Sequence, residues 1–190
     1  MKTNFFLAVL GFSLFFNHSN AQNSQDAHRD PTHNFTMQRL LIVNDKNEVL
    51  MCKEDYVWAP LSGMYSQRHY IKESLDSIAE AYGVRIKTPL LRGYFSYKYD
   101  YHPYSTLRSY YVAQYVDGVP KLPKGMSEVK WMPLAEAINK TTVTSIKQSM
   151  KQIFDFPNTV WGGSFMVSRE KQGHPTKKIE EFYPLFESRE

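Results

Sequence analysis

The alternation of apolar and polar residues is most regular in residues 58–84, WAPLSGMYSQRHYIKESLDSIAEAYGV. Four apolar side chains recur every three or four residues and so share one helix face: Ile71, Leu75, Ile78 and Tyr82. Three carboxylates fall on the opposite face, within an arc of about 60°: Glu73, Asp76 and Glu80. Gly83 is placed to end the helix and Val84 to begin a strand. The pattern therefore predicts a loop, an amphipathic helix and a strand.

Patterns typical of strands lie on both sides of this helix. Upstream, residues 37–43 and 49–53 predict a hairpin joined by the polar turn 44–47. Downstream, the pattern predicts an extended segment 85–99, a strand 107–116, a turn at 117–118 and a strand 128–132. A helix beginning at Pro133 and a second helix, 144–154, follow.

The last part of the chain predicts a second hairpin. Its strands are residues 161–167 and 179–186, and both are rich in aromatic side chains. Two aromatic strands need a surface that buries them, so we expect the hairpin, within an extension of residues 157–190, to pack on the preceding domain. The pair Gly162-Gly163 indicates a bulge in the first of these strands.

The first 21 residues have the pattern of a secretory signal peptide. Lys2 supplies a positive start, residues 5–16 are apolar apart from Gly11 and Ser13, and Ala21 is a small residue before Gln22. We expect cleavage after Ala21, a flexible polar leader over residues 22–36, and a secreted or periplasmic protein without a membrane span. The alternative is an uncleaved N-terminal anchor.

Composition and charge narrow the function classes. The 190 residues are 42% hydrophobic and 15% aromatic, as expected for a packed core. The net charge of +4 is spread along the chain without a basic run, so it does not indicate a nucleic-acid polymer as partner. Cys52 is the only cysteine, which excludes an internal disulfide, and we expect it to be buried in a strand.

Residues 62–84 resemble the Nudix box of the Nudix hydrolases, G-x5-E-x7-R-E-U-x-E-E-x-G-U, where U is a bulky apolar residue. Ile78, Glu80, Gly83 and Val84 match this pattern at its end. The other defining positions depart from it. The second Glu of the E-E pair falls on Ala81, the Glu of R-E on Ser77 and its Arg on Asp76, and the loop Glu falls on Arg68 or His69, depending on the direction of counting.

The resemblance implies an α+β fold, a Nudix-like α/β/α sandwich with a mixed sheet, over residues 37–156. It also implies a Mg²⁺ or Mn²⁺ site, which the family holds mainly at the positions of Ser77 and Ala81. One interpretation is a displaced metal site with Glu80 as ligand, and with Asp76 and Glu73 as further catalytic candidates. The other is a solvated acidic helix face. Helical spacing places Ser77 and Ala81 on the same side as Glu80.

Two functions follow as alternatives. The first is an exported Nudix domain with a degenerate box that binds a phosphorylated, nucleotide-like ligand or a protein partner. The second is a divergent metal-dependent hydrolase that cleaves a nucleoside diphosphate derivative. The residues that we expect to contact a phosphorylated ligand are basic and lie near predicted loops: Arg68, His69, Arg92 and Lys124. The sequence leaves the ligand and the oligomeric state open.

Overall fold

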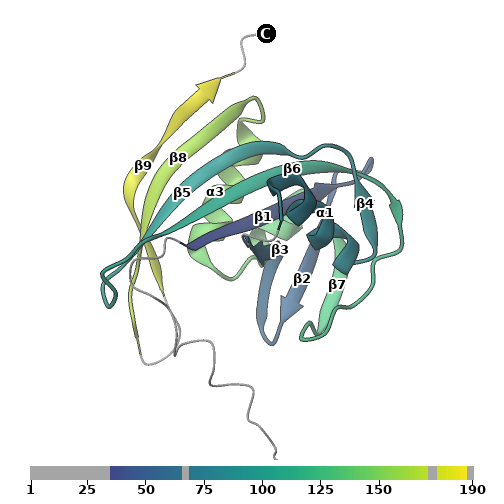
Figure 1. The fold of residues 1–190 in the computed structure, drawn as a ribbon, viewed down its shortest axis with the longest axis horizontal. Coiled ribbons are helices and arrows are strands. Elements are labelled where there is room, and N and C mark those ends of the chain that lie inside the picture. Colours follow the sequence, from purple (N-terminus) through teal and green to yellow (C-terminus); the bar gives the residue numbers. More distant parts are fainter. Residues whose placement is uncertain (1–34, 66–68, 171–174, 188–190) are drawn as a thin grey trace, which may run out of the picture. The chain divides into compact units, whose positions relative to one another are not determined.

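The computed structural model describes residues 35–65, 69–170 and 175–187, and Figure 1 shows how their elements are arranged. These residues form nine strands: β1 Phe35–Val43, β2 Glu48–Glu54, β3 Val57–Met64, β4 Val84–Ile86, β5 Leu90–Tyr99, β6 Thr106–Gly118, β7 Glu128–Pro133, β8 Thr159–Val167 and β9 Thr176–Glu187. The same residues form three helices: α1 Ile71–Ala81, α2 Leu134–Lys140 and α3 Thr144–Asp155.

The strands of the described residues form one mixed sheet in the order β7-β2-β3-β1-β6-β5-β8-β9, with β4 paired to β6 beside this series. Two of the pairings are parallel, β1 with β6 and β5 with β8. A parallel pair needs a crossover connection, and the chain between β5 and β8 supplies one that includes α2 and α3. The strand order places β1 and β6 at the centre of the sheet.

Both faces of the sheet are covered, which explains why β1 is apolar at consecutive positions. Leu40 and Ile42 face α1, whereas Leu41 between them faces the opposite side. The core on the α1 side includes Leu50, Leu61, Leu75 and Ile78. The other core includes Phe95, Tyr110 and Phe165 from the sheet and Ile146, Met150 and Ile153 from α3. The predicted α+β sandwich with a mixed sheet is thus confirmed.

Helix α1 lies where the sequence predicts it, but its buried face is shifted. Leu75, Ile78 and Tyr82 are buried as expected, whereas Ile71 is 51% exposed. Ser74 is buried in addition, because its hydroxyl donates a hydrogen bond of 2.6 Å to Oε1 of Gln38 on β1. At the first turn, contact with the sheet rather than hydrophobicity therefore decides which side chain is buried.

Gly83 after the helix is required by its surroundings. It has a φ of +77°, and a Cβ at this position would lie 2.5 Å from the backbone oxygen of Val119. The predicted turn at residues 117–118 is wrong, because Asp117 and Gly118 are the last residues of β6 and pair with β4. Gly118 has a φ of +109°, and a Cβ at this position would collide with the backbone oxygen of Gly83. Glycine at residue 118 therefore allows the end of β6 to lie close to the start of β4.

The loop predicted before α1 is in large part strand β3. Pro60 lies where β3 leaves one partner strand for another: it pairs with Met51 of β2, and the next residue, Leu61, pairs with Leu40 of β1. Trp58 and Leu61 are both buried. Pairing with both β1 and β2 stabilises as a strand a segment whose Pro, Ser and Gly are locally typical of a loop.

The C-terminal hairpin continues the sheet. β8 pairs with β5 and β9 pairs with β8, and Figure 1 shows both strands at the side of the sheet away from β7. The predicted bulge is confirmed, because the β8–β9 register shifts between Gly162 and Ser164. A Cβ at Gly162 would lie 2.7 Å from the ring of Tyr183, so this glycine lets the ring lie flat on the strand.

The signal peptide and most of the leader predicted for residues 22–36 lie outside the described residues. β1 begins at Phe35, two residues before the predicted start of the domain. In the described part of the chain, no helix is long and apolar enough to span a bilayer.

Candidate functional site

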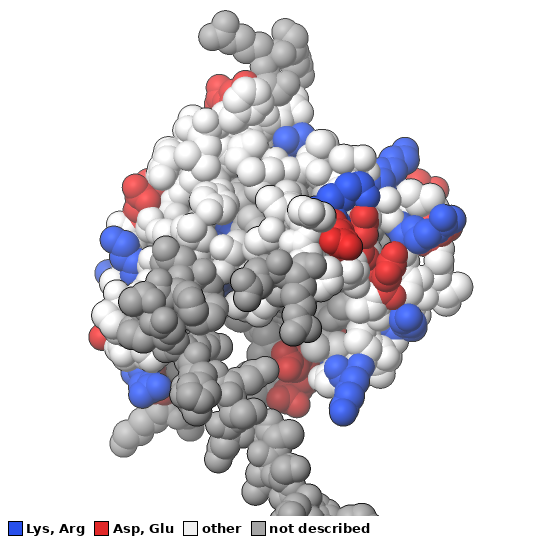
Figure 2. All heavy atoms as spheres, viewed as in Figure 1, with Lys and Arg blue, Asp and Glu red and all other residues white. Residues whose placement is uncertain are grey.

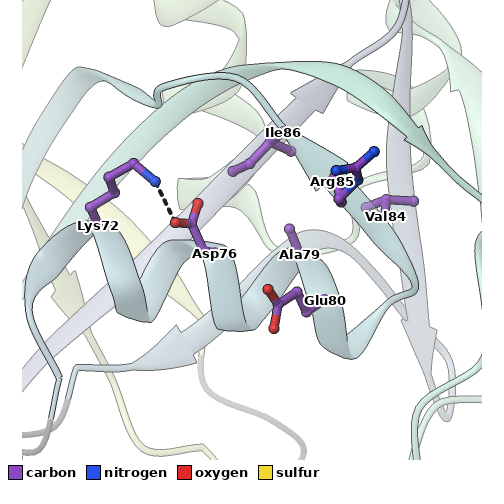
Figure 3. A pocket seen from close by; sticks show the side chains of 7 residues that line it. All are labelled: Lys72, Asp76, Ala79, Glu80, Val84, Arg85 and Ile86. Atoms are coloured by element: carbon purple, nitrogen blue, oxygen red, sulfur yellow. Dashed lines mark hydrogen bonds and ion pairs between the residues drawn. The ribbon is translucent and has the colours of Figure 1, made fainter.

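Helix α1 has a cavity on each of its two sides, and the one between α1 and β4 is drawn in Figure 3. This α1–β4 cavity has a volume of about 190 Å³. It is lined by Lys72, Asp76, Ala79, Glu80, Val84, Arg85 and Ile86. Two of the three candidate catalytic carboxylates, Asp76 and Glu80, therefore share one cavity.

The charged side chains of the α1–β4 cavity pair with near neighbours. Lys72 Nζ lies 2.5 Å from Asp76 Oδ2, one helical turn away. Arg85 donates through two nitrogens to the carboxylate of Asp117 on β6, and these bonds lower the pKa of Asp117. In Figure 3 the guanidinium of Arg85 points away from Glu80. Among the described residues, Glu80 takes part in no ion pair.

The three carboxylates of α1 therefore have three different environments. Glu73 lies at the start of the helix, where its Oε2 accepts a hydrogen bond of 3.1 Å from the backbone N–H of Tyr70. This bond satisfies one of the N–H groups left without a helical partner. In residues 35–65, 69–170 and 175–187, no three His, Cys, Asp or Glu side chains lie close enough together to hold a metal ion.

Three acidic side chains from loops and strand ends do not add a metal ligand to the carboxylates of α1, because each of them has another partner. Asp100 Oδ1 accepts a hydrogen bond of 3.2 Å from the backbone N–H of Arg169. Glu128 lies 2.8 Å from Lys53 Nζ, and the lysine lowers the pKa of Glu128. The carboxylate of Asp117 is held by Arg85 of β4.

The cavity on the other side of α1 lies between the helix and β3. This α1–β3 cavity has a volume of about 260 Å³ and is lined by Ser62, Met64, His69, Ser74, Ser77, Ile78, Ala81 and Tyr82. Ser77 and Ala81, which occupy the metal-holding positions of the box, thus lie in its wall. Glu80 lines the α1–β4 cavity instead, so the prediction that it shares a side with Ser77 and Ala81 is wrong. The helix turns enough between Glu80 and Ala81 to separate them.

A third cavity adjoins the α1–β3 cavity, because both are lined by Ser62 and Tyr82. We call it the Arg39 cavity. It has a volume of about 150 Å³ and is lined by Arg39, Cys52, Glu54, Val57, Ala59, Pro60, Ser62, Tyr82, Met126, Val143 and Ile146. We call these two neighbouring cavities together the cleft along β3.

Arg39 is a buried cation in this cleft that the sequence does not single out. Its side chain on β1 is only 8% exposed. Nη1 donates a long hydrogen bond of 3.4 Å to the carbonyl oxygen of Pro60, and Nε has no partner among the described residues. The sequence signal that could have identified Arg39 is its position as the one charged residue in the segment MQRLLIV. Arginine is rarely buried without a partner, so an arginine in a predicted core strand indicates a special environment.

The other polar groups of the Arg39 cavity are neutral, apart from Glu54. Cys52 is buried in β2, as predicted, and its Sγ donates to the carbonyl oxygen of Ala59 at 3.4 Å. Burial raises the pKa of the Cys52 thiol and that of the Tyr82 hydroxyl. Both side chains therefore stay protonated at neutral pH, and Cys52 is not a thiolate nucleophile.

Of the four predicted ligand-binding residues, the structure describes three and does not bring these three together. Arg68 lies outside the described residues. His69 lines the α1–β3 cavity. Arg92 lies on β5, where its Nη1 donates to its neighbour's carbonyl oxygen at 3.3 Å, and Lys124 lies exposed between β6 and β7. Neither Arg92 nor Lys124 lines any of the three cavities.

The charged side chains visible in Figure 2 do not segregate by sign on that face. On the face shown in Figure 2, basic and acidic side chains are interspersed on the right side, where Figure 1 places α1 and β4. Interspersed charges are typical of a solvated surface.

Comparison with known proteins identifies the fold. No family model matches the sequence, and no curated protein matches it significantly. Solved structures do match. A MutT protein from Bacillus halodurans has a TM-score of 0.62 and 16% identity, with 75% of this chain and 97% of that chain covered. A NUDIX hydrolase from Nitrosomonas europaea has a TM-score of 0.56 and 16% identity, with coverage of 65% and 90%.

A UDP-X diphosphatase is also similar, with a TM-score of 0.51 and 12% identity, and with 70% of this chain and 67% of that chain covered. All three similarities concern the arrangement of the backbone, because the identities are low. The chain therefore has the fold of the Nudix hydrolases, as the resemblance of residues 62–84 predicts.

Proposed function

We propose that this protein binds a phosphorylated, nucleotide-like ligand in the cleft along β3 and does not hydrolyse it through the box. The observation that carries the proposal is the wall of the α1–β3 cavity. A cleft is present beside the box helix, but Ser77 and Ala81, which line it, occupy the positions that mainly hold metal in the family. The solved structures of this fold include a UDP-X diphosphatase, which supports a phosphorylated nucleotide derivative as the class of ligand.

The residues at these positions do not fit a bound Mg²⁺ or Mn²⁺ ion. These cations take oxygen ligands and need carboxylates to offset their charge. Ala81 offers no ligand atom and Ser77 only a neutral hydroxyl, while Asp76 and Glu80 lie in the other cavity. The cleft instead offers hydrogen-bond donors, which suit phosphate oxygens. The hydroxyls of Ser62 and Ser77 and the ring of His69 line it.

Binding without turnover is the expected result of a combined ligand screen. The ligands are ADP-ribose, nucleotide sugars, dinucleoside polyphosphates and nucleoside triphosphates, each with and without Mg²⁺ or Mn²⁺. At a hundredfold excess over its Kd, a ligand adds about 2.7 kcal/mol to the free energy of unfolding. For a chain of this length that corresponds to a rise in Tm of roughly 5–10 °C. Product release is measured in the same samples.

Two outcomes would contradict the proposal. Turnover of about one per second with Mn²⁺, which is within the range of ordinary enzymes, would favour a divergent hydrolase that uses Glu80 and Asp76. If no ligand shifts Tm and none is cleaved, the cleft has another role. The variant Glu80→Gln separates the first outcome from contamination, because it should abolish genuine turnover through a displaced site and leave contaminating activity unchanged.

We propose further that the mature protein begins at Gln22 and is exported. The pattern of residues 1–21 supports this, with its short positive start, its apolar stretch and its small residue at the expected boundary. Expression of the full chain in a bacterial host, followed by N-terminal sequencing of the periplasmic or secreted fraction, should give Gln22 as the first residue. An intact Met1 terminus in the membrane fraction would instead indicate an uncleaved anchor.

A further inference from the structure

We infer that the Arg39 cavity is a receptor for one small anionic group, such as a phosphate of the bound ligand, with the Arg39 guanidinium as its counter-charge. The inference deepens the proposed function, on which the identification of the anion as part of a nucleotide-like ligand rests. It adds that Arg39 is a binding residue, that the anionic group lies at the Arg39 end of the cleft, and that the bound group is negatively charged.

Arg39 carries a buried charge that forms no ion pair with any of the described residues. The residue is 8% exposed and its Nε has no partner among the described residues. The carbonyl oxygen of Pro60 is a neutral acceptor at the long distance of 3.4 Å. A buried guanidinium is stabilised when a counter-charge accepts hydrogen bonds from it, and it is costly when none does. Since Arg39 lines a cavity, an anion in that cavity can offset the charge of its guanidinium.

A comparison with Arg108 shows that burial alone does not define the site. Arg108 on β6 also has a buried Nε without a hydrogen-bond partner. However, its guanidinium carbon lies 3.6 Å from the ring centroid of Tyr97, so the aromatic face stabilises its charge. Arg39 has no cation–π contact among the described residues, and Arg108 lines none of the three cavities.

The other walls of the cavity limit what can bind. The volume of about 150 Å³ equals that of roughly five water molecules at about 30 Å³ each, which suits one tetrahedral anion and not a nucleoside. Glu54 lines the same cavity, is exposed and forms no ion pair with Arg39. Its negative charge opposes an anion, so it weakens binding.

The position of the cavity connects it to the rest of the cleft. Ser62 and Tyr82 line both the Arg39 cavity and the larger α1–β3 cavity. One ligand can therefore place an anionic group beside Arg39 and its remainder beside α1. Arg39 and Ser62 are also direct partners in the β1–β3 pairing, so the sheet fixes the distance between the two parts.

The test uses inorganic phosphate as probe and calorimetric titration of the full-length mature chain. The unaltered protein should bind phosphate saturably. Arg39→Gln should weaken binding at least tenfold, and Arg39→Lys should restore part of it because the charge returns without the planar fork. Arg108→Gln, the matched control for a buried arginine, should change the affinity less than twofold. Glu54→Gln should tighten binding about two- to fivefold, because a nearby negative charge is removed.

The possible outcomes have distinct consequences. No phosphate binding by the unaltered protein, or equal losses for Arg39→Gln and Arg108→Gln, would overturn the inference. If Arg39→Gln fails to fold, the tightening by Glu54→Gln is still required, and its absence would overturn the inference. Phosphate binding without any nucleotide binding would support the Arg39 receptor and contradict the proposed function. Nucleotide binding that is insensitive to both phosphate and Arg39→Lys would support the proposed function and contradict the Arg39 receptor.

Discussion

Replacing Phe95 by alanine should lower the free energy of unfolding by about 3–5 kcal/mol, the range for a large aromatic side chain removed from a packed core. Phe95 on β5 is fully buried. Its ring centroid lies 5.3 Å from that of Tyr110, 6.1 Å from that of Phe165 and 5.5 Å from that of Phe182. These rings belong to β6, β8 and β9, so one side chain joins the C-terminal hairpin to the centre of the sheet.

Urea denaturation of the mature chain measures this loss, and the preceding residue provides the control. Tyr94 points to the other face of β5 and is 40% exposed. Tyr94→Ala should therefore lower the free energy of unfolding by less than about 1 kcal/mol. If the hairpin instead packed on an independent domain, Phe95→Ala would give a loss below about 1 kcal/mol or two separate transitions. Either result would contradict a single sheet that unfolds as one unit.

The sequence predicts this fold well where hydrophobic periodicity and burial coincide. Leu75 and Ile78 of helix α1 are buried at the predicted spacing, and strand β4 begins at the buried Val84, as the pattern indicates. It fails where pairing with other strands decides the structure of a segment. The segment of strand β3 is typical of a loop because its Pro60 and Gly63 are unfavourable for a strand in isolation, and only pairing with β2 and β1 outweighs that preference.

The candidate site is predicted less well, for a related reason. The sequence does show which residues occupy the box: Ser77 and Ala81 lie at positions where the family has carboxylates. The sequence does not show which side chains form ion pairs. Lys72 pairs with Asp76 in the same helix, whereas Arg85 pairs with Asp117 of β6. Arg39 is missed because its significance depends on a cavity formed by three strands, one helix and three connecting segments.

The double change Ser77→Glu with Ala81→Glu should create a Mn²⁺ site in the α1–β3 cavity. Both positions are exposed and line this cavity, and His69 lines it as well. Two carboxylates one helical turn apart, with an imidazole nearby, provide ligand types that Mn²⁺ accepts. Without metal, their repulsion should cost about 0.2–0.5 kcal/mol. With Mn²⁺ at a hundredfold excess over its Kd, the variant should gain about 2.7 kcal/mol.

Calorimetric titration with Mn²⁺ compares this double variant with two controls. Glu80→Gln in the same background should change the affinity less than twofold, because Glu80 lines the α1–β4 cavity. Lys72→Glu places a third carboxylate in that other cavity, beside Asp76 and Glu80; its wall has Arg85 and no histidine, so this variant should bind Mn²⁺ more weakly. Equal binding by Lys72→Glu would mean that any group of neighbouring helical carboxylates suffices. No binding by the double variant would show that α1 is aligned incorrectly with the metal-holding positions of the box, and the residues at 77 and 81 could then not explain an absence of hydrolysis.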